Sequence, residues 1–246
     1  CYSAPDLPYL LPGAGYSINF NRMKRLLIIL PFLLTTMISH GQFNMGIKGG
    51  VHLTSLNYDN RLGQRPINKE PKVGYLGGLT FQYFHQENLG LQFETLFIQK
   101  GFKTAFDSVS NTQYERTIDY LSIPFLLHGY IGKNNYSISL ILGPYGSFAL
   151  QSREILTEGQ DVIRNNYEYD DQVDNRFEFG LQGGIGLKSA FSFGTLEVQG
   201  QYGYSFTSLF KWNAVNPDPD KDRFFTIPEQ AQNQGLQISL HYYYSF

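Results

Sequence analysis

Six charged residues are candidates for a shared polar site, because each falls on the polar side of an alternating segment. They are Lys48, Lys100, Lys188, Glu94, Glu178 and Glu197. Neighbouring side chains of an extended strand lie on opposite faces, so each charge is placed opposite a row of apolar side chains. Charges enclosed together must pair, since an unpaired buried charge carries a large desolvation cost. The pattern therefore predicts a polar network inside a closed sheet.

The segment 207–230 carries a candidate calcium site. Four acidic residues occupy the first, third, fifth and twelfth positions of a calcium-loop spacing: Asp218, Asp220, Asp222 and Glu229. However, Arg223 stands where the turn needs glycine, and Pro219 and Pro228 stiffen the segment. We therefore expect a solvated acidic loop without a metal.

Aromatic residues of the same segment are candidates for a surface role. They are Phe210, Trp212, Phe224 and Phe225. Large amphipathic rings serve both at partner interfaces and at the membrane–water boundary. Both interpretations stay open, and we favour anchoring at the boundary.

Histidines on the polar faces raise the question of metal binding or catalysis. His52, His128 and His241 show no HExxH or similar spacing, so we expect hydrogen-bonded core residues. Ser55 lies near His52 in sequence, but no acid is placed to orient the histidine, and no GxSxG is present. We expect neither an enzyme nor a cofactor.

Eight segments with a period of two must position these residues. They span residues 43–53, 73–84, 89–101, 120–131, 136–150, 176–188, 195–206 and 231–246. In the last segment, the apolar face consists of Leu236, Ile238, Leu240, Tyr242, Tyr244 and Phe246. Each segment is long enough for a tilted strand to cross a bilayer. The predicted fold class is all-β: an eight-stranded antiparallel up-and-down transmembrane β-barrel, whose interior is just wide enough for side chains to fill.

The connections between these segments alternate in length. The short ones cover residues 85–88, 132–135 and 189–193, and the long ones cover 57–72, 102–119, 151–175 and 207–230. This asymmetry is typical of bacterial barrels whose tight turns face the periplasm. The acidic connection 151–175 is expected to be hydrated. Pro124 and Pro144 fall inside strands, so we expect a bulge or a missing ladder bond near each.

Composition and the N-terminal region limit the class of protein further. Aromatic residues make up 16% of the 246 residues, and the net charge of -2 gives no basis for nucleic-acid binding. The only cysteine is Cys1, so no internal disulfide can form. A basic start at Met23, an apolar run and small residues before Gln42 indicate a signal peptide over residues 23–41. Residues 1–22 are expected to be unstructured upstream sequence, and residues 42–246 the barrel domain.

Several segments resemble a known family. These are GIKGGVHLTSL, YLSIPFLLHGYI, LILGPYGSFAL, FEFGLQGGIGL and the terminal ISLHYYYSF. They are similar to the small outer-membrane β-barrels described as porin-like or PorT-like, over residues 42–246. The resemblance implies an eight-stranded barrel in the outer membrane of a Gram-negative bacterium. PorT is associated with protein secretion and gliding, a role that strand patterns alone do not transfer to this chain.

Three functions follow in order of preference. The first is a structural or interaction protein with a side-chain-filled lumen, acting through extracellular loops. The second is a narrow porin-like channel for small solutes, and the third is an outer-membrane lipid hydrolase. Expected partners are outer-membrane lipids, lipopolysaccharide, and envelope or secretion proteins. The expected location is the outer membrane, with long loops outside and both termini in the periplasm.

Overall fold

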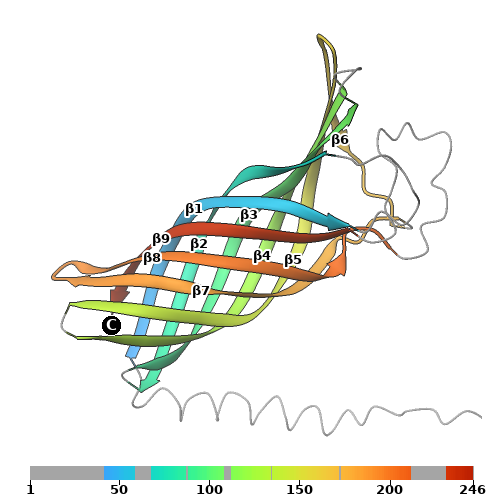
Figure 1. Ribbon diagram of the computed structural model, residues 1–246. Coiled ribbons are helices and arrows are strands. Elements are labelled where there is room, and N and C mark those ends of the chain that lie inside the picture. The colour runs from blue at the N-terminus through green and yellow to red at the C-terminus, as the bar shows by residue number, and fades with distance from the viewer. Residues whose placement is uncertain are drawn as a thin grey trace, which may run out of the picture. The chain divides into compact units, whose positions relative to one another are not determined.

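The computed structural model describes residues 42–58, 68–86, 88–107, 112–133, 135–171, 173–211 and 231–245. Nine strands make up almost all of this part of the chain (Figure 1). They are β1 Gln42–Tyr58, β2 Asn68–Gln86, β3 Leu89–Asp107, β4 Thr112–Lys133, β5 Tyr136–Glu158, β6 Asp161–Tyr167, β7 Phe177–Phe191, β8 Gly194–Ser208 and β9 Ala231–Ser245. No helix among these described residues is long and apolar enough to cross a membrane.

Eight of the nine strands close into one barrel. The sheet order is β4-β3-β2-β1-β9-β8-β7-β5-β6, and β4 also pairs with β5, which closes the ring. All pairings are antiparallel, and β6 pairs only with β5, so β6 lies outside the ring. The predicted eight-stranded antiparallel up-and-down barrel is confirmed.

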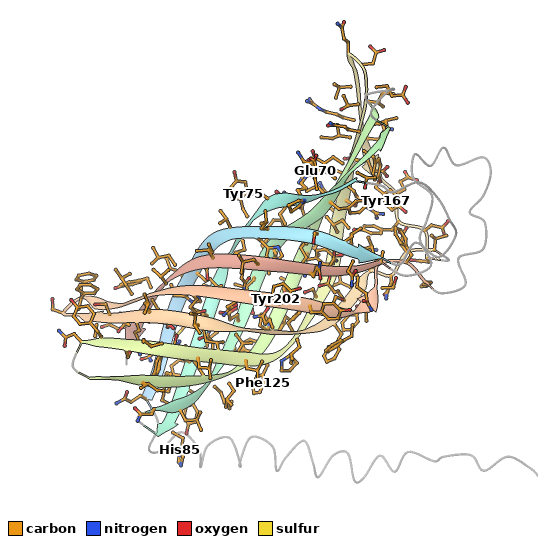
Figure 2. All side chains as sticks on the ribbon, in the orientation of Figure 1. Glu70, Tyr75, His85, Phe125, Tyr167 and Tyr202 are labelled. Carbon is orange, nitrogen blue, oxygen red and sulfur yellow. The ribbon has the colours of Figure 1, made fainter. Side chains whose placement is uncertain are left out.

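The strands turn their apolar side chains outward and their polar side chains inward. On β1, Ile47 is 60% exposed whereas the adjacent Lys48 is 3% exposed. Tyr75 and Phe125 project from the barrel surface in the same way (Figure 2). This is the reverse of a soluble protein, and such an apolar outer surface is stable when hydrocarbon surrounds it.

The two ends of the barrel differ. At one end, called here the turn end, tight turns join β2 to β3, β4 to β5 and β7 to β8, and both Gln42 and Ser245 lie there. At the other, the loop end, β3, β4, β5 and β6 rise beyond the remaining strands (Figure 1). His85 marks the turn end, and Glu70 and Tyr167 mark the loop end (Figure 2).

Two expected long loops are largely strand. Residues 102–119 belong mostly to the ends of β3 and β4, which pair as far as Asp107 and Thr112. Residues 152–167 form a hairpin of β5 and β6 around Gly159, whose φ of 60° suits a tight turn. These extensions carry polar side chains on both faces, so they lack the alternation that marks the membrane-facing part.

The prolines interrupt the ladders without displacing them. The β3–β4 ladder omits Ile123 and Pro124, and the β4–β5 ladder continues from Tyr145 to Leu142 without Pro144. The register is the same on both sides of each gap, so the strands lose ladder bonds there and do not form bulges. This agrees with the missing donor of proline.

Some expectations fall outside the described residues. These are the upstream segment 1–22, the signal peptide 23–41, and most of the segment 207–230.

The lipid-facing assignment predicts a depth-dependent cost for charge. Leu240 is 52% exposed in the middle of β9, so Leu240→Arg is expected to destabilise the barrel by about 2–4 kcal/mol. Tyr244→Arg, close to the turn end of the same strand and face, should cost less because arginine reaches the interface there. Urea unfolding in lipid vesicles measures both. An equal cost for the two variants would contradict the assignment.

Candidate functional site: a filled lumen with a capped end

A fully buried ion pair lies in the turn-end half of the lumen. The Lys48 Nζ lies 2.9 Å from the Glu94 Oε2, and both side chains have zero exposed area. The Nε2 of Gln92 donates to the other carboxylate oxygen of Glu94 at 2.6 Å. The pair joins β1 to β3, which are not neighbours in the sheet. It therefore bridges part of the lumen rather than lining its wall.

Glu197 and Lys188 face the same half of the lumen but do not form an ion pair with each other. Glu197 accepts a hydrogen bond from Ser139, and its Oε1 lies 3.3 Å from the His128 Nε2. The Lys188 Nζ lies 4.0 Å from the ring centroid of Tyr130. Lysine is thus held by an aromatic face, and glutamate by a histidine and a hydroxyl.

Amide side chains fill the space between these charges. Gln82 donates to Gln92 at 2.8 Å, and the Nδ1 of His128 lies 2.6 Å from the same Gln92 oxygen. Across the lumen, Gln201 donates to Gln199 at 2.8 Å. The group of buried and partly buried residues at this level is called here the turn-end plug. It consists of Lys48, Gln82, Gln92, Glu94, His128, Tyr130, Lys188, Glu197, Gln199, His241 and Tyr243.

A second ion pair lies further toward the loop end. The Lys100 Nζ lies 2.5 Å from the Glu178 Oε1, which also accepts a hydrogen bond from the Tyr145 hydroxyl at 2.8 Å. The Nδ2 of Asn233 donates to the other Glu178 oxygen at 2.6 Å. A small chamber lies beside this pair. Its lining includes His52, Lys100, Ser122, Tyr145, Gln182 and Gln237.

An apolar cluster covers the chamber at the loop end. This cluster, called here the cap, consists of Leu56, Phe102, Tyr114, Ile118, Tyr120, Ala149, Leu156, Val173, Leu209, Phe210 and Ala231. Two segments that follow β6 and β8 meet above it. Lys211 N donates to the Val173 carbonyl at 2.8 Å, and Asn175 N donates to the Leu209 carbonyl at 2.9 Å.

Arg116 on β4 contacts residues of both the barrel wall and the segment that follows β6. It is 2% exposed, and its guanidinium carbon lies 3.7 Å from the centroid of the Tyr167 ring. Its Nε donates to Ser152 at 2.9 Å, and its Nη2 lies 3.7 Å from an Asp174 oxygen. Planar stacking combined with charge pairing is a geometry that arginine provides and lysine does not. Asp174, expected in a hydrated loop, is instead buried.

The structure separates the expected site residues into groups. It pairs Lys48 with Glu94 and Lys100 with Glu178, and it places Lys188 and Glu197 in the turn-end plug with other partners.

The aromatic residues expected at the surface of the segment 207–230 are only partly within the described residues. Phe210 is 3% exposed inside the cap, so the surface role expected for it is wrong: the chain folds back over the lumen at this point. Trp212, Phe224 and Phe225 lie outside the described residues, as do Asp218, Asp220, Asp222 and Glu229.

The structure separates the serine and the histidine that the sequence suggested as a hydrolase pair, His52 and Ser55. No group of three metal-ligating side chains occurs in the described part of the chain. The Nδ1 of His52 lies 2.7 Å from the Thr54 hydroxyl inside the lumen. Ser55 is on the opposite face of β1 and accepts from Gln234 at 3.3 Å. A serine and a histidine on opposite sides of the sheet cannot act together.

Sequence reasoning missed several members of these groups. Asn233 and Tyr145 lie an even number of residues from side chains of the same strand that face the lumen. The alternation of faces alone could therefore have indicated that they face the lumen too. Arg116 had no such signal, because the extension that holds it was expected to be a loop.

A belt of charged side chains, most of them in ion pairs, lies on the outer face at the loop end. This belt, called here the outer charged belt, consists of Lys72, Lys103, Glu115, Asp119, Arg153 and Arg164. Glu115 pairs with Lys72 and with Lys103, the latter at 3.1 Å, and Arg153 Nη2 lies 3.0 Å from Asp119 Oδ2. Burial by itself raises the pKa of Glu115, but hydrogen bonds from Lys72 and Lys103 outweigh it, and the pKa lies below its usual value.

A closed sheet with an apolar outside and a polar, side-chain-filled inside defines a membrane β-barrel. A family model described as "Outer membrane protein beta-barrel domain" matches residues 31–211. The chain belongs to this family of outer-membrane barrels.

Solved structures of small outer-membrane barrels are similar at low identity. OprG from Pseudomonas aeruginosa is 14% identical, with 83% of this chain and 97% of that chain covered and a TM-score of 0.45. Ail, the attachment invasion locus protein of Yersinia pestis, is 12% identical, with coverage of 82% and 98% and a TM-score of 0.38. The outer membrane protease OmpT from Escherichia coli is 10% identical, with coverage of 84% and 98% and a TM-score of 0.37. No curated protein matches the sequence.

The buried pair of Lys48 and Glu94 predicts strong coupling in a double-mutant cycle. Lys48→Met or Glu94→Gln alone leaves one buried charge without its partner, which should cost about 3–5 kcal/mol of unfolding free energy. The double variant should recover most of that loss, because no uncompensated charge remains. Urea unfolding of the four proteins measures the coupling. Additive losses would show that the two charges do not depend on each other.

The shifted pKa of Glu115 predicts a stability change with pH. The folded-state pKa is below the unfolded value, so the Glu115 interactions stabilise fully above pH about 4.5 and are lost as the pH falls through the folded pKa. Glu115→Gln should therefore be less stable than the wild type at pH 7, and the difference should shrink below pH about 4.5. Urea unfolding at pH 7 to 3 measures this difference. A difference that stays constant over that range would contradict the prediction.

Proposed function

We propose that this protein is a structural or interaction protein of the outer membrane, with an occluded lumen and a loop end that faces outside. The single observation that supports occlusion is the turn-end plug, in which Lys48, Glu94 and His128 are all buried between opposite walls. An eight-stranded barrel leaves no continuous water path once its inward side chains interdigitate.

The charges of the plug support the same proposal. In a water-filled pore, ionic side chains stay hydrated and need no protein partner. Here Glu94 receives hydrogen bonds from both Lys48 and Gln92, and Glu197 accepts a hydrogen bond from Ser139 and has the His128 Nε2 3.3 Å from the same oxygen. This degree of internal pairing fits a permanently dry centre better than a conducting one.

The orientation follows from the unequal ends. Tight turns and both ends of the described barrel share the turn end, which in bacterial barrels is the periplasmic side. The cap and the extended hairpins of β3 to β6 would then face the exterior. The contacts of the protein with its surroundings are accordingly assigned to the loop end.

A narrow channel for small solutes is the second candidate. The chamber beside Lys100 and Glu178 favours it, because this part of the lumen is less completely filled. Opening such a channel would require displacement of both the cap and the turn-end plug.

Planar-bilayer recordings separate the two candidates. The wild-type protein is expected to insert without discrete openings. A variant carrying Gln92→Gly, Glu94→Gly and His128→Gly should conduct, because three side chains of the plug are removed. Loss of the folded band on boiling serves as the control that each protein is a folded barrel. Reproducible discrete openings of the pure wild-type protein would overturn the occluded lumen in favour of the channel.

A further inference from the structure

The outer charged belt begins where the lipid-facing band ends. On β4, Asp119 and Glu115 continue the same face as Leu121, which is exposed to lipid. Across the strands, Lys103 pairs in register with Glu115, and Ile155 with Arg164, so these side chains share one row of the outer face. The belt therefore lies at the level of the headgroups, just beyond the hydrocarbon.

Within the belt, Lys103, Arg153 and Arg164 are exposed, whereas Lys72 is buried beneath its partners and the carboxylates are less exposed than these three cations. The side chains of Lys103 and Arg153 are 44% and 46% exposed, whereas those of Glu115 and Asp119 are 26% and 9% exposed. Arg164 is also exposed, and it makes no ion pair with any residue that the structure describes. The charge presented to the surroundings is consequently positive, although exposed Glu70 lies beside Lys103 at the upper margin.

On the opposite side of the barrel, the described residues of β1, β8 and β9 present neutral polar groups at this level. There, Tyr202 donates to Gln234 at 3.1 Å, and Gln234 donates to Ser55 at 3.3 Å. Tyr204 donates to Gln232 at 2.5 Å. Hydroxyl and amide groups on β1, β8 and β9 thus replace the charges found on β2 to β6. Headgroups beside β1, β8 and β9 would therefore meet neutral polar groups among the described residues, whereas headgroups beside β3 to β6 would meet cations.

We propose that the outer charged belt binds the phosphate groups of lipopolysaccharide in the outer leaflet, with Lys103, Arg153 and Arg164 as the contacting cations. The assignment rests on the proposed orientation, which puts the loop end outside. Arginine donates two parallel hydrogen bonds to a phosphate, and Asp119 orients Arg153 for such a contact. Attraction between basic side chains and anionic lipid falls off within a screening length, so a belt in contact with the headgroups is well placed.

The test compares full-length protein in phosphatidylcholine vesicles with and without diphosphoryl lipid A. The readout is the temperature at which the folded band is lost on a gel, followed as the lipid A fraction rises. Lipid A should raise this temperature for the wild type. Arg164→Gln should need about two- to fivefold more lipid A for the same rise, because one exposed charge contact is lost without disturbing an ion pair. Combining it with Lys103→Gln and Arg153→Gln should abolish the rise.

Lys211→Gln is the matched control, since it removes one exposed cation at the cap and outside the belt. It should respond to lipid A as the wild type does. The proposal is overturned if Arg164→Gln and Lys211→Gln respond alike, if dephosphorylated lipid A is equally effective, or if inorganic phosphate alone gives the same rise. Conductance is a separate readout: a conducting barrel that still responds to lipid A would remove the occluded lumen and leave this proposal standing.

Discussion

The need to satisfy polar groups without water determines most of this structure. In hydrocarbon, every backbone donor and acceptor must be paired inside the protein, which forces the sheet to close on itself. Eight strands close with an interior that side chains fill. Lysines and glutamates that are buried in this interior must find partners there, since an unpaired buried charge is costly. The ion pairs of Lys48 with Glu94 and of Lys100 with Glu178 are direct results.

The same constraint explains why some of the fold could be predicted and some could not. The apolar–polar alternation exists because lipid and lumen impose opposite demands on adjacent residues, as in Ile47 and Lys48. Beyond the bilayer, the outer face no longer contacts lipid, so its side chains need not be apolar and the alternation ends. The sequence therefore predicts loops where the extensions of β3, β4 and β5 and the strand β6 lie, and it carries no signal for the inward position of Arg116.

The pairing of the buried charges was also only partly predictable. The alternation of faces along a strand indicates which residues face the lumen. Which side chains pair across the lumen depends on the stagger of the strands and on the length of each side chain. Lys188 and Glu197 are opposite each other in the β7–β8 register, yet Lys188 lies against Tyr130, and Glu197 accepts a hydrogen bond from Ser139. Side-chain lengths and aromatic neighbours decided this outcome, and neither can be read from the period of a strand.

The central claim is that the lumen is dry and closed, and its most direct test is the chemical accessibility of a lumen residue. Ser122 is 1% exposed beside the chamber, and the only native cysteine, Cys1, precedes the barrel. Ser122→Cys is a small change that places a thiol inside the barrel, in a background with Cys1 replaced by serine. In vesicles, a membrane-impermeant maleimide is expected to label this thiol only after the protein is unfolded. Rapid labelling of the folded protein would contradict the closed lumen.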